Sequence, residues 1–310
     1  MRIILAKPRG FCAGVERAIR CVEEAIERFG PPVYVLNDIV HNAHVVNLLR
    51  ERGAVFVKKL EEVPKGSHLL FSAHGVGPSR YEEASQYRME VIDATCPLVE
   101  KVHNEARRFA KRDHVIILIG EPGHDETIGT MGWAPNHIRR VLTIEDVAAL
   151  DIPEDEEISY ITQTTLSVDD CTRVINALKQ KYSHIVGPPS DDICYATTNR
   201  QGAVKELAPD ADLVLVVGDE TSANSNRLVE IAVGQGKPAF LIRDAGDINE
   251  RMIESAQTIL LTAGASAPEA LVRGVVEFFR RRGPCTVEER DTVVESVHFK
   301  LPKTLETATG

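Results

Sequence analysis

The 310-residue sequence predicts an α/β fold. Short runs rich in Val, Ile and Leu alternate along the chain with segments of helical periodicity. The runs are apolar almost throughout, which is typical of parallel strands buried on both faces of a sheet. A third observation is that one cysteine context occurs three times, which indicates three similar units.

The expected strands are the short apolar runs, at 33–40, 54–57, 68–72, 91–94, 115–120, 140–144, 158–162, 213–218, 239–242 and 258–262. Helical periodicity is expected at 15–29, 43–52, 98–111, 168–181, 226–232 and 268–281. Helices between strands indicate parallel crossover connections. The tail from about Gly283 to Gly310 is expected to hold one or two strands and a frayed end.

Composition excludes several classes of protein. Lys and Arg number 36 against 46 Asp and Glu, a net charge of −10, which argues against a nucleic-acid partner. No apolar run approaches the length of a membrane span. The N-terminus, MRIILAKPRGFC, is too weakly apolar for a signal peptide and lacks an import leader. We therefore expect a cytoplasmic protein with no membrane association.

The sequence holds six cysteines and no CxxC pair. Three of them share one context, in which a strand-like run is followed by the cysteine and then by a helix: Cys12, Cys96 and Cys194. The other three, Cys21, Cys171 and Cys285, lie outside this context and are expected to be buried or incidental.

Polar strand ends follow each repeated cysteine. The first set lies 28 to 30 residues after the cysteine and consists of His41, His124 and Asn224. The second set is His74, Thr164 and Ser266. From this repeat we expect three α/β domains, at 1–95, 96–190 and 191–310, the last including the tail.

The carboxyl ends of parallel strands are where α/β proteins bind ligands. If the three units pack around a common axis, the three cysteines meet near it. Such thiolates would suit zinc, cuprous copper or an iron–sulfur cluster. A cubane held by three thiolates leaves one iron open for substrate. Zinc, or a single nucleophilic cysteine, remains the alternative at this point.

The polar strand ends suit a phosphate, because helix N-termini present free N–H groups and a positive dipole. Ser222, Asn224 and Ser266 could equally be ordinary helix caps. Histidine is not a preferred cap, so His41, His74 and His124 are the more informative residues. Glu126, in the loop of His124, could donate a proton if a dehydrated cavity raises its pKa.

Nine motifs carry a resemblance to a known family. They are PRGFCAGV at 8–15, IVHN at 39–42, FSAHGV at 71–76, DATCPLV at 93–99, GHDE at 123–126, TQTTLS at 162–167, DDICYATTNRQ at 191–201, NSNRL at 224–228 and TAGASAP at 262–268. The sequence resembles the family of 4-hydroxy-3-methylbut-2-enyl diphosphate reductases, from residue 1 to about residue 300. These enzymes catalyse the last step of the non-mevalonate isoprenoid pathway.

The resemblance implies a trefoil of three similar α/β domains with a pseudo-threefold arrangement around a central 4Fe–4S cluster. It implies that Cys12, Cys96 and Cys194 ligate the cluster, whose open iron binds the substrate hydroxyl. Two electrons then arrive through the cluster from a small donor such as ferredoxin or flavodoxin. The products are isopentenyl diphosphate and dimethylallyl diphosphate.

The resemblance also assigns roles to the polar residues. Glu126, Thr164 and His124 would be catalytic, with Glu126 delivering the proton that releases water and Thr164 holding the hydroxyl or relaying that proton. The diphosphate would be held by His41, His74, His124, Ser222, Asn224 and Ser266, with Thr165 close by. Many members have serine where this chain has Ala223, so that contact would come from the backbone N–H or be missing. The lack of a transit leader fits a bacterial enzyme or a mature form.

Two other functions are compatible with the residues alone. A cysteine-dependent hydrolase or transferase acting on a phosphorylated substrate would need one activated thiolate beside a histidine. A zinc-stabilised binding protein would need no catalysis. Nucleotide-binding glycine motifs, GxGxxG and GxxxxGK[ST], do not occur in the sequence.

Overall fold

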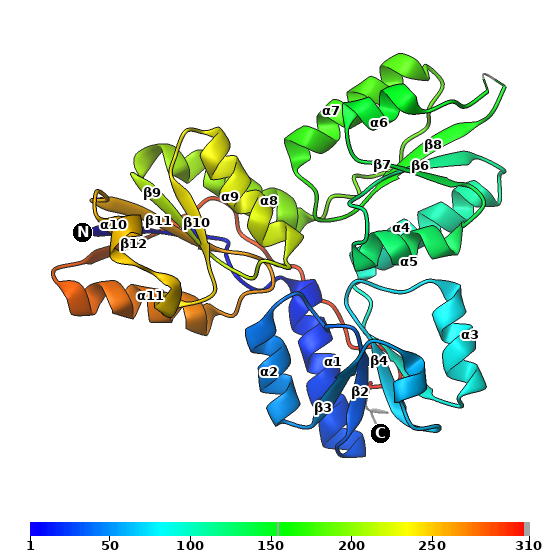
Figure 1. Cartoon of the computed structure of the whole chain (residues 1–310), viewed down its shortest axis with the longest axis horizontal. Helices are drawn as coiled ribbons and strands as arrows, with labels where there is room; N and C mark the ends of the chain where they lie inside the picture. Colours follow the sequence, from blue (N-terminus) through cyan, green and yellow to red (C-terminus); the bar gives the residue numbers. More distant parts are fainter. Residues whose placement is uncertain (154, 307–310) are drawn as a thin grey trace. The chain divides into compact units, whose positions relative to one another are not determined.

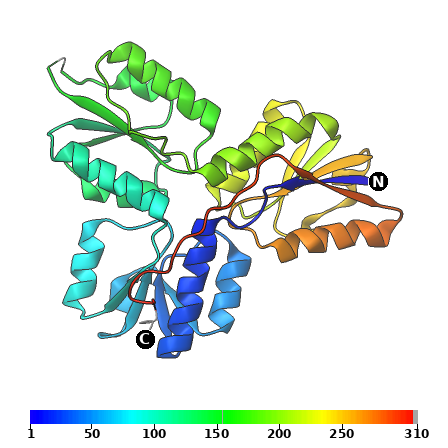
Figure 2. The ribbon, with the colours of Figure 1, turned by 180° about the vertical axis from the view of Figure 1, so that it is seen from behind.

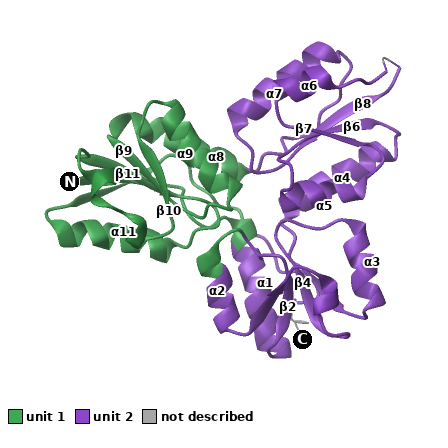
Figure 3. Cartoon of the chain, in the orientation of Figure 1, with its two compact units in different colours: residues 1–15, 41–45, 195–298 green, residues 16–40, 46–194, 299–310 purple. Residues whose placement is uncertain are grey.

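The computed structural model describes residues 1–153 and 155–306. The chain divides into two compact units (Figure 3), of which unit 1 comprises residues 1–15, 41–45 and 195–298, and unit 2 comprises residues 16–40, 46–194 and 299–310. Three sheets with all strands parallel confirm the α/β prediction. Within the described residues, every helix is too short or too polar to cross a bilayer.

Unit 1 is built on a five-stranded sheet. Its strands, in spatial order, are β10 (Ala239–Ile242), β9 (Leu213–Val217), β11 (Thr258–Ala263), β1 (Arg2–Lys7) and β12 (Thr286–Asp291). Figure 2 shows the blue β1 beside the red β12 at the edge of this sheet. β12 is one of the one or two strands expected in the C-terminal tail.

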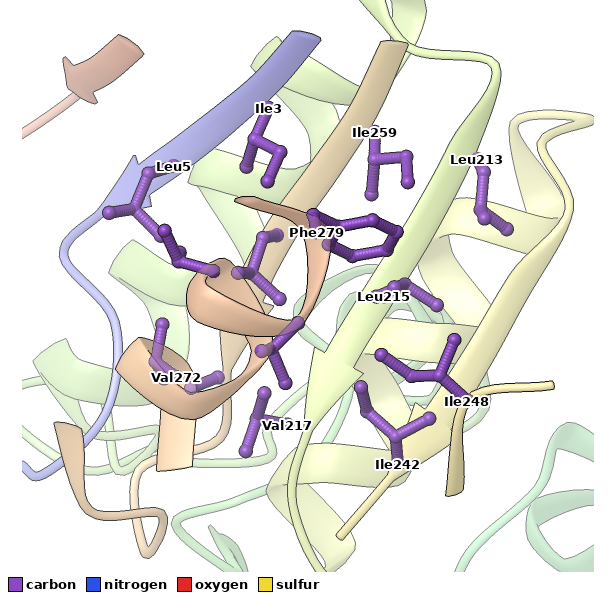
Figure 4. Packing of buried hydrophobic residues seen from close by; sticks show 14 of the residues in the cluster. Ile3, Leu5, Leu213, Leu215, Val217, Ile242, Ile248, Ile259, Val272 and Phe279 are labelled. Atoms are coloured by element: carbon purple, nitrogen blue, oxygen red, sulfur yellow. The ribbon is translucent and has the colours of Figure 1, made fainter. Parts of the chain in front are cut away.

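Helices cover both faces of the unit 1 sheet. The longer ones are α8 (Tyr195–Leu207), α9 (Ala223–Gly234) and α11 (Glu269–Arg282), with α10 (Glu250–Ile253) and the 3₁₀ turns η2 (Ala208–Asp210) and η3 (Ala245–Asp247) in the connections. One core forms between the sheet and α11, where Phe279 packs over Ile3, Leu5 and Leu215 (Figure 4). A second core forms between the opposite face and α8 and α9.

Unit 2 holds the other two sheets (Figure 1). The first has the order β3 (Ala54–Val57), β2 (Val33–Leu36), β4 (His68–Phe71), β5 (Glu90–Asp93), and the second has the order β7 (Ile138–Val141), β6 (Val115–Ile119), β8 (Ile158–Thr162). The accompanying helices are α1 (Ala13–Phe29), α2 (Ala43–Glu51), α3 (Pro78–Gln86), α4 (Pro97–Ala110), α5 (Asp125–Trp133), α6 (Ile144–Ala149) and α7 (Val168–Lys181), with η1 (Leu60–Glu62). Helices α1 and α2 begin within unit 1 residues and continue in unit 2.

Local chemistry shortens or shifts two expected strands. β2 ends at Leu36 because Asn37 has a left-handed backbone with φ 59°, which does not continue a strand. The strand expected at 140–144 lies at Ile138–Val141. The last residues of the predicted strand belong instead to the start of α6, where Thr143 forms a capping box with Asp146.

The three sheets share one strand order. In each sheet, the last position of this order is taken by the segment that precedes a repeated cysteine. β5 precedes Cys96 and pairs with β4, and Val186 precedes Cys194 and bridges to Ser159 of β8. The equivalent neighbour of β11 is β1, which precedes Cys12. The strand-like run before Cys12, which has no place among the expected strand ranges, therefore completes the sheet formed by strands of residues 191–310. Placing residues 1–7 in a domain 1–95 was wrong; the limits at 95 and 190 stay a prediction.

Replacing Phe279 with alanine tests the unit 1 core. Phe279 is 3% exposed, and large-to-small changes of a buried Phe cost about 3–5 kcal/mol. We expect Phe279→Ala to lower the temperature of the unfolding transition strongly in differential scanning calorimetry. The control Val294→Ala, at a residue 82% exposed, should leave the transition in place. Equal shifts in both variants would contradict this account of the core.

Candidate functional site

Each repeated cysteine stands at the start of a helix. Cys12 directly precedes α1, Cys96 is the N-cap of α4, and Cys194 directly precedes α8. None of the three forms a disulfide, and all three are half-buried. A helix N-terminus carries a partial positive charge, which stabilises a thiolate, although burial opposes this at Cys12 and raises the pKa of that thiol.

The backbone N–H of each of these cysteines donates to a carbonyl in the loop that follows a strand. These strands are β11 for Cys12, β4 for Cys96 and β8 for Cys194. Cys12 donates to the carbonyl of Ala265 at 3.2 Å, Cys96 to that of Ala73 at 2.9 Å, and Cys194 to that of Thr164 at 3.1 Å. The residues that follow these carbonyls are Ser266, His74 and Thr165. In the second copy of the repeat, the residue that corresponds to His74 and Ser266 is therefore Thr165 and not Thr164.

The predicted site residues fall into two groups. Unit 1 carries Cys12, His41, Ser222, Ala223, Asn224 and Ser266, and unit 2 carries His74, Cys96, His124, Glu126, Thr164, Thr165 and Cys194. Cys21 and Cys171 are buried among apolar side chains, as the sequence predicts for cysteines outside the repeat, and Cys285 is half-buried.

Hydrogen bonds gather the polar residues of unit 1. Ser266 Oγ donates to the carbonyl of His41 at 2.9 Å and lies 3.5 Å from Ser222 Oγ. Asn224 Oδ1 accepts from the N–H of Ala265 at 2.9 Å. Ser222, Asn224 and Ser266 are at most 6% exposed. Buried hydroxyl and amide groups at one helix start form an anion-compatible cluster.

Ser222 is also the N-cap of α9, where its Oγ accepts from the N–H of Ser225. Capping and ligand contact are therefore both open to this side chain. Ala223 is the first residue of α9, and the first N–H groups of a helix have no intrahelical partner. Its backbone N–H can thus serve an anion although its side chain cannot.

Two supporting residues near His41 were not singled out in the sequence. Asn42 caps α2 by accepting the N–H of Val45 at 3.2 Å, and Asp219 accepts the N–H of Ala43 at 2.9 Å. Asp219 is the second residue after β9, so it ties the loop after this strand to the start of α2. A polar residue directly after a predicted strand was the available signal for both.

In unit 2, His124 proves to be a helix cap, contrary to the sequence expectation for histidine. Its Nδ1 accepts the N–H of Glu126 at 3.1 Å at the start of α5. A neutral ring accepting at Nδ1 carries its proton on Nε2 and presents it as a donor. The ring of His74 lies edge-on to that of His124, with centroids 5.8 Å apart. Two imidazoles at one helix N-terminus suit a phosphate group.

Glu126 is a buried acid at the start of α5. Its side chain is buried, with Oε1 accepting from the N–H of Thr164 at 2.6 Å and Oε2 from Thr164 Oγ1 at 2.9 Å. Burial raises the pKa of Glu126 to about 7, although both bonds from Thr164 oppose the rise. At neutral pH this carboxyl holds or releases a proton readily, as a general acid must.

Gln163 is a further residue that the sequence analysis missed. Its Oε1 accepts the N–H of Glu121 at 2.8 Å and the hydroxyl of Thr127 at 3.2 Å. Its Nε2 donates to Thr165 Oγ1 at 2.9 Å. The amide therefore holds the loop before α5 and the hydroxyl of Thr165 in fixed relation, and only the fold reveals this because the partners lie about forty residues apart.

Comparisons with known proteins agree with the motifs. The family model described as LytB protein matches residues 3–280. A protein of Mycobacterium ulcerans (strain Agy99), named 4-hydroxy-3-methylbut-2-enyl diphosphate reductase, is 49% identical over 308 residues, covering 99% of this chain and 93% of the relative. A relative of that name from Zymomonas mobilis subsp. mobilis is 52% identical over 305 residues, covering 98% and 90%.

A solved structure from Plasmodium falciparum, described as the E-1-hydroxy-2-methyl-but-2-enyl-4-diphosphate reductase, is also similar. It matches with a TM-score of 0.95 and 41% identity, covering 98% of this chain and 96% of that one. A second reductase structure, described as the terminal enzyme of the non-mevalonate pathway, matches with a TM-score of 0.65 and 30% identity, covering 90% and 99%.

The bond from the hydroxyl of Thr164 to Glu126 yields a test. Thr164→Val keeps the backbone donor but removes a hydrogen bond that stabilises the carboxylate, so the pKa of Glu126 should rise above about 7. Infrared titration should show the protonated carboxyl band persisting to higher pH than in the unaltered protein. Glu126→Gln, which lacks the carboxyl, identifies the band. A pKa that falls in Thr164→Val would contradict the proposed electrostatics.

Proposed function

The chain belongs to the LytB protein family, and we propose on this basis that it removes the hydroxyl group of 4-hydroxy-3-methylbut-2-enyl diphosphate reductively. The products would be isopentenyl diphosphate and dimethylallyl diphosphate, in the last step of the non-mevalonate isoprenoid pathway. The observation that carries the proposal is the buried Glu126–Thr164 pair, whose carboxyl has a pKa near 7. A hydroxyl becomes a good leaving group only when it is protonated, and this pair can supply the proton.

The cysteines fit an iron–sulfur cofactor by the chemistry of the donor set. Cys12, Cys96 and Cys194 are not in disulfides, are half-buried and lie at helix starts, where the helix dipole stabilises negative charge. We propose that these three thiolates hold a 4Fe–4S cluster at the centre of a three-domain trefoil. When bound, such a cluster supplies electrons and one iron without a protein ligand.

The overall step balances with two electrons and two protons. The carbon–oxygen bond of the allylic alcohol breaks, the oxygen leaves as water, and a carbon–hydrogen bond forms on the allyl group. Glu126 delivers the proton to the departing oxygen, and Thr164 holds the hydroxyl group or relays that proton. His124 orients the loop of Glu126 through its Nδ1, and so also serves catalysis.

Charged and polar donors around the helix starts would hold the diphosphate. From unit 1 these are His41, Ser222, Asn224, Ser266 and the N–H of Ala223. From unit 2 they are His74, His124 and Thr165. Diphosphate oxygens accept hydrogen bonds from hydroxyl, amide, imidazole and backbone N–H groups alike.

The electrons require a redox partner, for which we propose a small carrier such as a ferredoxin or flavodoxin. The six cysteines are not in disulfides, which is typical of a reducing compartment, and we propose the cytoplasm.

The acidity of Cys12 argues against this thiol as the nucleophile of a cysteine-dependent hydrolase or transferase. A nucleophilic thiolate needs a lowered pKa. Burial instead raises the pKa of Cys12, that of Cys21 to about 11 and that of Cys171 to about 12. A zinc-stabilised binding protein stays the second candidate, since three thiolates also suit zinc.

Exchanging one proposed ligand tests the cluster. We expect Cys96→Ser to lose bound iron, acid-labile sulfide and activity, because a serine hydroxyl is a poor iron ligand in a thiolate site. Cys285→Ser, at a cysteine outside the repeat, is the matched control and should keep iron, brown colour and activity. Iron and sulfide are assayed on anaerobically purified protein. Full activity of Cys96→Ser would refute the ligand assignment, and a colourless protein with stoichiometric zinc would favour the second candidate.

Exchanging the proposed acid tests the proton path. Glu126→Gln keeps the shape of the side chain but cannot release a proton, so we expect kcat to fall about 10²–10⁴-fold while iron content and diphosphate binding persist. Single-turnover kinetics with reduced protein measures the step. An unchanged rate would remove Glu126 from the mechanism.

A further inference from the structure

The three helices that begin at the repeated cysteines share a second feature, a cation about one and a half turns into the helix. It is Arg17 in α1, Lys101 in α4 and Arg200 in α8, which lie five, five and six residues after the cysteine. Arg17 is 8% exposed, the side chain of Lys101 is 26% exposed and that of Arg200 is fully buried. Buried cations in proteins require specific acceptors.

The acceptors of Arg17 lie directly before Cys96. Its Nη1 donates to the carbonyl of Thr95 at 3.0 Å, and its Nη2 to that of Asp93 at 3.4 Å. Its Nε donates to the carbonyl of Lys300 in the C-terminal tail at 2.7 Å. A cation on the helix of Cys12 therefore holds the segment that delivers the next cysteine of the repeat.

Lys101 repeats this arrangement one copy later. Its Nζ donates to the carbonyls of Ser190 and Asp191 at 2.7 and 2.9 Å. It also contacts Oδ1 of Asp192 at 2.8 Å, whose other oxygen accepts the N–H of Thr162. The helix of Cys96 thus holds the segment before Cys194.

Arg200 closes the series on the segment before Cys12. Its Nη2 donates to the carbonyl of Gly10 at 2.7 Å and to that of Phe11 at 3.3 Å, and its Nε donates to Gly10 at 3.1 Å. Glu295 of the tail pairs with Nη1 at 2.9 Å. The first helix holds the second cysteine segment, the second holds the third, and the third holds the first.

We propose that Arg17, Lys101 and Arg200 are positioning residues arranged in a cycle, each clamping the segment of the next cysteine rather than that of its own. This inference deepens the proposed function, since it explains how three thiols at distant points of the sequence are kept in place for one cofactor. Hydrogen bonds from charged donors are about twice as strong as neutral ones, and two or more to neighbouring carbonyls restrict the backbone before the thiol. We name these three residues the clamp cations.

The cyclic order distinguishes clamping from ordinary helix packing. A cation that merely stabilised its own helix would affect the cysteine at the start of that helix. A clamp cation affects the cysteine of the next copy. Lys101 therefore acts on Cys194 and not on Cys96, Arg17 acts on Cys96 and not on Cys12, and Arg200 acts on Cys12 and not on Cys194.

Thiol reactivity measured cysteine by cysteine tests this order. Full-length protein purified without cofactor is treated with iodoacetamide under anaerobic reducing conditions, and alkylation at each site is followed by peptide mass spectrometry. We expect Lys101→Met to speed alkylation of Cys194 roughly tenfold, since the lost bonds are to a charged donor, and to leave Cys96 unchanged. Arg17→Met should speed Cys96 alone, and Arg200→Met should speed Cys12 alone.

Matched controls use exposed cations of the same helices, Arg20→Met in α1 and Arg108→Met in α4, which should change none of the three rates. If circular dichroism shows that Arg17→Met or Arg200→Met is unfolded, the corresponding Lys variants keep a charged donor. They should show a smaller acceleration at the same cysteine. Faster alkylation of the cysteine on the variant's own helix, equal acceleration at all three, or no change would overturn the proposal.

A second measurement separates this proposal from the proposed function. In protein reconstituted with iron and sulfide, iron loss to a chelator should be faster in the Met variants than in the two controls. If the unaltered protein binds no iron, the proposed function is wrong. The order of alkylation rates still tests whether the clamp cations act on the cysteine of the next copy. If iron binds but the alkylation order is absent, the clamp fails and the ligand assignment stands.

Discussion

The hydrogen bond from the N–H of each repeated cysteine to the loop after a strand is the constraint on which the site depends. Because the N–H groups of Cys96 and Cys194 donate to the carbonyls of Ala73 and Thr164, the backbone of each cysteine is held against the loop that carries His74 or Thr165. The same bond holds Cys12 against the loop that carries Ser266. A parallel sheet brings its strand ends to one edge. The same backbone hydrogen bond, formed three times, therefore holds a cysteine against a loop that carries a polar residue.

Glu126 illustrates how burial raises the pKa of an ordinary acid into the neutral range. The sequence places three acids near one another, at 121, 125 and 126, and nothing in their spacing separates them. Only Glu126 is buried against Thr164, and desolvation raises its pKa to about 7 against the opposing hydrogen bonds. The capping of α5 by His124 fixes the orientation of that first turn, so the acid and the imidazole belong to one local structure.

The clamp cations extend the threefold repeat from the cysteines to the residues that hold the segments before them. Their carbonyl acceptors lie in the segments just before the thiols, and two of the clamps also take a partner from the C-terminal tail, Glu295 for Arg200 and the carbonyl of Lys300 for Arg17. The tail, whose docking could not be deduced from its composition, thereby contributes to the segments that carry Cys12 and Cys96. The C-terminal tail therefore stabilises two of the three clamp cations.

The amino-acid sequence by itself determined the α/β class, the three repeated cysteines and most of the polar strand ends, because these depend on local periodicity and on residue types at short spacing. Tertiary structure decided that β1 completes the sheet of β9 and β11, and that Thr165 is the repeat equivalent of His74. It also decided the roles of Gln163, Asp219 and the clamp cations. These features depend on hydrogen bonds and strand pairing between residues that lie from about 20 to 280 positions apart, and the pattern of one stretch of sequence carries no record of what folds against it.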